Sequence, residues 1–238
     1  MNMKIRKFLV LMTFLGCLIQ ACVESEAPNI DLSGSGYYPL QVGNFWTYQM
    51  DQIDYLTLGN DTSSYELREL ISDSIVTSSG EVTYLISRQL WQEAEEEWQT
   101  NTIWQVRKNA QSAVVTEDGV SFVKLVFPVA IGKEWNGHAF NNIGSRVFRY
   151  EAVEDREILS MLLDQDTSLV VKTVLSDQVS AIVGTDQRSE IYVNGIGLVQ
   201  KDLFVIELCT ESSRCPDNFG DTLSGIFLSQ VLIDYGKL

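Results

Sequence analysis

Hydrophobic and polar residues alternate with a period of two along much of the chain. In Asn44–Asp51 (NFWTYQMD), Trp46, Tyr48 and Met50 fall on one face, and polar residues separate them. Successive side chains of a β-strand point to opposite faces, so this alternation predicts half-buried strands. We expect further strands at Tyr65–Val76, Val82–Trp91, Thr102–Lys108, Ser121–Phe127, Val147–Val153, Leu169–Leu175, Gln178–Val183, Glu190–Val193, Val199–Leu208 and Phe227–Tyr235.

Turn signals separate the expected strands, and helical spacing is rare. In Val147–Val153 one face is expected to hold Phe148, Tyr150 and Ala152, and in the last strand one face is expected to hold Phe227, Val231, Ile233 and Tyr235. Only Asp155–Leu163 (DREILSMLL) places apolar residues at helical spacing. The pattern predicts a mainly β fold: a single domain over residues 37–238, built as a strongly curved antiparallel sheet or open half-barrel with at most one or two short helices. The turn signals are Gly59-Asn60-Asp61, Ser78-Ser79-Gly80, Asp118-Gly119 and Asn136-Gly137.

The first 21 residues have a different character from the rest of the chain. Three basic residues at positions 4, 6 and 7 precede the apolar run Phe8–Ile19. A helix of that length rises only about 18 Å, which is too short for a hydrocarbon core of about 30 Å. This is the architecture of a secretory signal peptide, residues 1–21. The polar residues 22–36 that follow are expected to form a flexible tether.

The end of this leader, Leu18–Cys22 (LIQAC), resembles the lipobox of bacterial lipoproteins. The resemblance implies that the Cys22 thiol is acylated and that Cys22 becomes the new N-terminus. The acyl chains would then anchor the protein in the membrane of the bacterial cell envelope, as an outer-membrane lipoprotein on the periplasmic or the surface-facing leaflet. Cys17, which follows Gly16, is a rival position. A secreted protein cut near Ala21 with a free Cys22 is the other alternative.

Charge narrows the range of partners. The chain has 17 basic and 32 acidic residues, a net charge of −15. Such a surface repels phosphate backbones, so we expect no nucleic-acid partner. It also repels anionic lipid headgroups, so the acyl anchor must supply the membrane contact. Glu24 and Glu26 resemble the surface-export signal of Bacteroidota lipoproteins, or they simply solvate the tether.

Cys209 and Cys215 are the cysteines that remain after the leader. An exported protein meets an oxidising compartment, which favours a disulfide between them. Zinc binding is the alternative, but it needs about four ligands, and the sequence offers neither a second cysteine pair nor a nearby histidine. We therefore expect a disulfide.

Motifs for catalysis, metals and cofactors are scarce. The single histidine, His138, lies beside Asn136-Gly137 and is expected in a turn. Asp164–Ser168 and Asp217–Asp221 are acidic turns that could hold calcium, but both lack the full calcium-loop pattern. We predict no catalytic residue, no metal and no cofactor.

An acidic run lies between two tryptophans. Glu93, Glu95, Glu96 and Glu97 separate Trp91 from Trp98, which places the acids at a hairpin tip. The acids are typical of a solvated turn. Exposed tryptophans can stack on sugar rings, so Trp91 and Trp98 are the candidate ligand contacts.

Four segments in order carry a family resemblance over most of residues 37–235. They resemble a set of Bacteroidota lipoproteins, which implies a curved antiparallel sheet similar to the open half-barrels of periplasmic lipoprotein carriers, and implies no activity. The disulfide loop is not part of that pattern. The segments are Tyr37–Tyr48 (YYPLQVGNFWTY), Phe127–Trp135 (FPVAIGKEW), Tyr192–Lys201 (YVNGIGLVQK) and Leu223–Tyr235, which ends in SQVLIDY.

The glycines and tryptophans of these segments have a structural interpretation. Gly43 and Gly132 are expected to turn the chain so that Trp46 and Trp135 pack inward. The alternative is a ligand groove lined by these aromatic rings.

Two functions from different classes fit the sequence. The first is a non-catalytic binding or structural module for an envelope protein, a lipid or a glycan. The second is a carboxylate-dependent hydrolase, for example one that resembles a glycosidase. Two inward-facing carboxylates about 5–9 Å apart in a cleft would favour the hydrolase.

Overall fold

The computed structural model describes residues 34–57, 59–78, 80–153, 170–180, 182–211, 215 and 220–238. This part of the chain holds one short 3-10 helix, η2 (Ser35–Tyr37), and twelve strands. The strands are β1 (Asn44–Leu56), β2 (Gly59–Val76), β3 (Val82–Gln92), β4 (Glu97–Lys108), β5 (Ser112–Glu117), β6 (Val120–Val126), β7 (Glu134–Asn136), β8 (Val147–Val153), β9 (Val170–Ser180), β10 (Gly184–Val193), β11 (Gly197–Leu208) and β12 (Thr222–Lys237).

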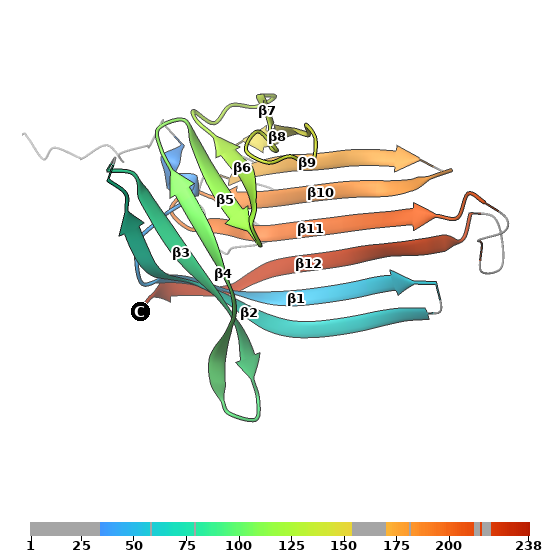
Figure 1. Cartoon of the computed structure of the whole chain (residues 1–238), viewed down its shortest axis with the longest axis horizontal. Helices are drawn as coiled ribbons and strands as arrows, with labels where there is room; N and C mark the ends of the chain where they lie inside the picture. Colours follow the sequence, from blue (N-terminus) through green and yellow to red (C-terminus); the bar gives the residue numbers. More distant parts are fainter. Residues whose placement is uncertain are drawn as a thin grey trace, which may run out of the picture. The chain divides into compact units, whose positions relative to one another are not determined.

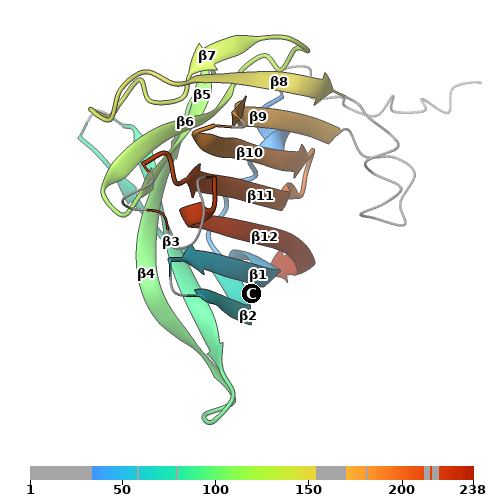
Figure 2. The ribbon, with the colours of Figure 1, turned by 90° about the vertical axis from the view of Figure 1, so that its right-hand side faces the viewer.

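The strands form one antiparallel sheet in the order β6-β5-β4-β3-β2-β1-β12-β11-β10-β9-β8-β7 (Figure 1). Every strand pairs with its neighbour in sequence except at one point, and β1 pairs with β12. Two meanders are therefore joined through the first and last strands. Figure 2 shows the sheet curling until β4–β6 stand across the ends of β9–β12. The result is a nearly closed barrel with one open seam, which confirms the predicted fold class.

The seam lies between β6 and β7, which are consecutive in sequence. Between these two edge strands the described residues form no ladder, but individual hydrogen bonds bridge them. Val123 N donates to Gly137 O over 2.8 Å, and Trp135 Nε1 donates to Val123 O over 2.8 Å. The Tyr150 hydroxyl accepts a bond from Val126 N and donates one to Val126 O. Side chains of the second meander thus fasten the seam.

The alternation along β1 and β8 places their side chains as predicted. Trp46, Tyr48 and Met50 are buried together in one core cluster, and Phe148 and Tyr150 are buried on β8. Trp135 packs partly buried against the second core cluster. These packing contacts support the structural interpretation of the tryptophans. The first cluster also contains Leu67, Ile71, Ile86, Val106 and Val115, and the second contains Tyr37, Ala113, Leu125, Phe127, Tyr150 and Tyr192.

The predicted face of β12 is wrong. Ile233 and Tyr235 are 52% and 45% exposed, whereas Leu228 and Leu232 pack on the core and Gln230 is 2% exposed. Both faces of this strand carry apolar residues, so alternation alone does not fix which one points inward. Gln230 lies on the buried face although its side chain is polar.

Several strand boundaries also differ from the prediction, and β4, β10 and β12 each begin earlier than expected, at Glu97, Gly184 and Thr222. Gln178–Val183 is not a separate strand, because β9 continues to Ser180 and β10 begins at Gly184. Asp177 and Gln178 pair with Gln187 and Asp186 in an exposed hairpin arm, where polar residues do not signal a turn. The polar start of β2 and the short strand β5 were not predicted. In both, the two-residue alternation is weak.

Cys209 and Cys215 form a disulfide, as predicted. Several other predictions lie outside the described residues: the signal peptide, Cys22, the helix at Asp155–Leu163, Asp164–Ser168 and most of Asp217–Asp221. In the described ranges, no helix has the length and apolar character needed to cross a membrane. The same ranges bring no group of three His, Cys, Asp or Glu side chains together as metal ligands.

Candidate functional site

A row of polar side chains crosses the inner face of the sheet. Thr173, Glu190, Lys201 and Gln230 are register partners on β9, β10, β11 and β12. Directly opposed residues in antiparallel strands share a face, so the four side chains lie side by side. Thr173, Glu190 and Gln230 are buried. Burial of polar groups is unfavourable unless they are hydrogen-bonded, so this row requires partners.

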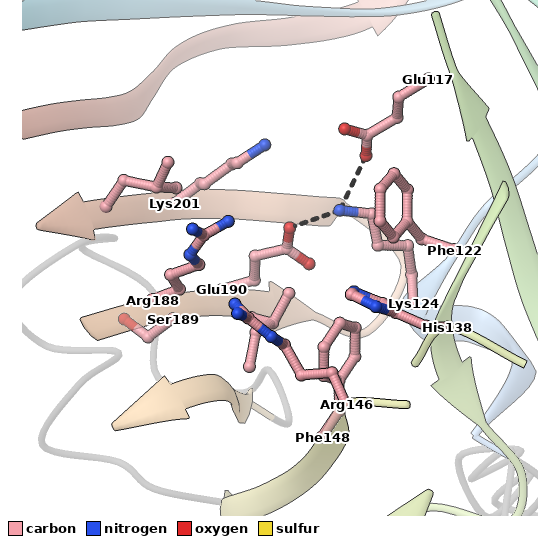
Figure 3. Close-up of a pocket in the computed structure, with 12 residues that line it drawn as sticks. Glu117, Phe122, Lys124, His138, Arg146, Phe148, Arg188, Ser189, Glu190 and Lys201 are labelled. Carbon is pink, nitrogen blue, oxygen red and sulfur yellow. Dashed lines mark hydrogen bonds and ion pairs between the residues drawn. The ribbon is translucent and has the colours of Figure 1, made fainter. Parts of the chain in front are cut away.

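Part of the row is satisfied by an ion-pair network with the other meander. Lys124 Nζ on β6 lies 2.7 Å from Glu117 Oε1 at the end of β5, and 2.8 Å from Glu190 Oε1. The Tyr192 hydroxyl donates to Glu190 Oε2 over 2.6 Å. Figure 3 shows the Lys124 ammonium between the two carboxylates. The network therefore connects β5 and β6 to β10 across the interior.

The environment fixes the charge states of this network. Burial raises the pKa of the Glu117 carboxyl, but attraction to Lys124 and Lys201 and the bond from Lys124 outweigh it and hold the pKa at about 2. Burial lowers the pKa of Lys124, yet Glu117 and Glu190 raise it above its usual value. Burial, and then Glu190, raise the pKa of the Tyr192 hydroxyl. At neutral pH, Glu117 is thus ionised, Lys124 protonated and Tyr192 a neutral donor.

A pocket of about 170 Å³ opens beside the network (Figure 3). A chamber of about 20 Å³ lies against the same groups and is also lined by Tyr38, Glu69 and Gln230. A space of that size holds about one water-sized group. The pocket is lined by Glu117, Phe122, Lys124, His138, Arg146, Phe148, Leu175, Arg188, Ser189, Glu190, Lys201 and Leu203.

Some donors around these spaces have no partner among the described residues. The Lys201 ammonium makes no hydrogen bond and no ion pair with the described residues, although Lys201 lines both the pocket and the chamber. Gln230 Nε2 is buried without a partner in the same part of the structure, as is Thr173 Oγ1 at the far end of the row. Arg146 and Arg188, in contrast, share Asp186, at 3.1 and 2.7 Å.

The single histidine forms part of the pocket wall. His138 lies in the turn after β7, as predicted, and its Nδ1 is 2.9 Å from Gly144 O. Its ring packs edge-on against Phe122 and Phe148, with centroids 5.4 and 5.9 Å away. These contacts indicate that the His138 ring has a structural role in the pocket wall.

The candidate contacts Trp91 and Trp98 lie away from the pocket. They are register partners at the end of the β3–β4 hairpin, with ring centroids 5.3 Å apart, and the acidic residues form the turn beyond them. The Arg68 guanidinium carbon lies 4.2 Å from the Trp98 ring centroid. Trp98 is therefore half-buried, contrary to the expectation of a largely exposed side chain. Trp91 remains 39% exposed.

Sequence reasoning did not find Glu117, Lys124, Glu190 or Lys201. The available signal was a lysine inside the apolar strand VSFVKLV, because a charge in such a strand needs a buried partner. Comparison of the chain with protein-family models, with curated proteins and with solved structures gave no match. The resemblance to Bacteroidota lipoproteins stays a prediction.

Proposed function

We propose that this protein is a non-catalytic lipoprotein of the bacterial cell envelope that binds a small organic molecule in the seam pocket. One observation carries the proposal: the Lys201 ammonium and Gln230 Nε2 have no acceptor among the described residues, and both line the inner chamber. Gln230 is buried, and a buried donor without an acceptor costs about 1–3 kcal/mol. A bound molecule, together with a water-sized group in the chamber, would supply the missing acceptors.

The state of the carboxylates supports binding over hydrolysis. A glycosidase of the usual type needs a protonated carboxylic acid near a second carboxylate. Glu117 is held ionised, with a pKa of about 2. Both oxygens of Glu190 already accept bonds, from Lys124 and Tyr192. The pair is thus engaged in a structural network and poorly placed to protonate a leaving group.

Filling the pocket tests the binding role. Ser189 lines the pocket on β10, and a phenylalanine there would occupy its volume. Native mass spectrometry of the acylated protein, purified from its own envelope in mild detergent, should show a bound small molecule in the wild type and in Ser189→Ala. We expect Ser189→Phe to lack it. An unliganded wild type that hydrolyses a chromogenic glycoside, with activity lost in Glu190→Gln, would establish the hydrolase instead.

The membrane anchor is a separate prediction. Metabolic labelling with a clickable fatty acid should tag the wild-type protein and leave Cys22→Ser untagged, because the label requires the Cys22 thiol. Cys17→Ser is the matched control and should be labelled like the wild type. Equal labelling of Cys22→Ser and wild type would refute acylation at this position.

A further inference from the structure

The charge around the seam pocket is opposite in sign to that of the chain. The whole chain carries −15, yet among the described residues the pocket wall and its direct partners hold one more positive than negative group. Lys201 is the surplus cation, because each of the other cations has a carboxylate within ion-pair distance. The positive groups are Lys124, Arg146, Arg188 and Lys201, and the negative groups are Glu117, Asp186 and Glu190.

The two arginines keep donors available next to Lys201. Arg146 contacts Asp186 through Nη1, and Arg188 does so through Nε and Nη2. A guanidinium has five N–H donors, so each arginine retains several. Figure 3 shows the Arg146, Arg188 and Lys201 head groups converging on one side of the pocket. Such a set of donors suits a carboxylate, which binds arginine through two parallel bonds.

The rest of the pocket wall is apolar. Phe122, Phe148, Leu175 and Leu203 provide its hydrocarbon surface. The volume of about 170 Å³ lies below the range of roughly 300–1,000 Å³ that is usual for drug-sized ligands. The pocket therefore fits a short apolar stem.

We propose that the ligand of the seam pocket is a small amphiphilic monocarboxylate, whose head binds Lys201 and Arg188 and whose stem lies on Phe122, Phe148 and Leu203. The proposal rests on the binding function proposed above. One negative charge balances the surplus cation. A phosphate monoester, which carries about −1.5 to −2 at pH 7, would leave a net negative charge. A neutral molecule would leave the Lys201 ammonium without an ion-pair partner among the described residues.

Isothermal titration calorimetry with hexanoate tests this assignment. The acylated protein is held in lipid nanodiscs, and empty nanodiscs serve as the blank. Hexanoate should bind, whereas hexanol, acetate and hexyl phosphate should each bind at least about ten-fold more weakly, as expected when a charge-assisted bond, the apolar contact or the charge balance is lost. Hexanol or hexyl phosphate binding as tightly as hexanoate would overturn the monocarboxylate assignment.

Variants of Lys201 locate the head group. Lys201→Gln should weaken hexanoate binding by about ten-fold or more, and Lys201→Arg should retain it because the charge is kept. Lys237→Gln removes the same charge from an exposed position outside the pocket and should bind like the wild type. Unchanged hexanoate binding in a folded Lys201→Gln protein would overturn the proposal. If the native protein nevertheless holds a molecule that Ser189→Phe excludes, the binding function stands and only the ligand class is wrong.

Discussion

The Lys124→Met variant is expected to lose about 3–5 kcal/mol of its free energy of unfolding at pH 7. Lys124 Nζ is the shared ion-pair partner of Glu117 and Glu190, and Glu190 is buried. Methionine fills a similar volume but donates no hydrogen bond, so two carboxylates would remain in the interior without their counter-charge. Urea unfolding followed by tryptophan fluorescence measures the loss.

The pH dependence of stability should change sign in the same variant. In the wild type, the folded-state pKa of Glu117 is about 2, below the value of about 4.3 for an unfolded chain. Its contribution of about 3 kcal/mol is present above pH 4.3 and is lost as the pH falls towards 2. Without Lys124, burial of Glu117 outweighs the remaining attractions and raises the pKa of its carboxyl. The variant should therefore gain stability relative to pH 7 as the pH falls from the raised pKa to about 4.3, which is above the window in which the wild type loses its contribution.

Two controls separate charge from packing. Lys237→Met removes an exposed lysine and should keep wild-type stability and pH dependence. Adding Glu117→Gln and Glu190→Gln to Lys124→Met removes the two carboxylates that lost their counter-charge. The triple variant should regain most of the lost stability. Parallel pH profiles for Lys124→Met and wild type would show that the ion pairs do not govern this part of the interior.

The sequence was informative where one face of a strand is apolar and the other polar. On β1 and β8 that contrast predicted both the strand and its buried face. On β12 both faces carry apolar residues. Which face is buried therefore depends on how Leu228, Gln230 and Leu232 pair and pack with the neighbouring strands. That information lies in tertiary pairing and is absent from the local pattern.

The site could not be predicted because it depends on long-range register. Lys124 and Glu190 are 66 residues apart in sequence, and Lys201 faces Gln230 only because β11 and β12 pair as they do. A slip of one residue would turn each of these side chains to the opposite face. Bulges at Arg188/Ser189 and Ile191/Tyr192 shift the register beside the site, and nothing in the local sequence fixes their position.

A second large loss of stability is expected for Trp46→Ala, about 3–5 kcal/mol. The Trp46 side chain is 8% exposed and packs in the first core cluster. Its Nε1 donates a hydrogen bond to Ile196 O, in the turn that leads into β11. The ring also lies against Gly197, where an added Cβ would come within 3.4 Å of Nε1. Truncation would open a cavity and remove the donor to that carbonyl, so β1 would lose its contact with the β10–β11 turn.

Trp98→Ala is the matched comparison, since the same indole is removed from a half-buried position. Trp98 contacts Trp91 and Arg68 near the hairpin end and belongs to neither core cluster. Its loss should cost about 1 kcal/mol, the scale of one aromatic pair with one cation–π contact. Urea midpoints from far-ultraviolet circular dichroism compare the two variants without relying on tryptophan emission. If Trp46→Ala kept the wild-type midpoint but no longer retained a bound molecule, Trp46 would line a ligand groove and the core interpretation would be wrong.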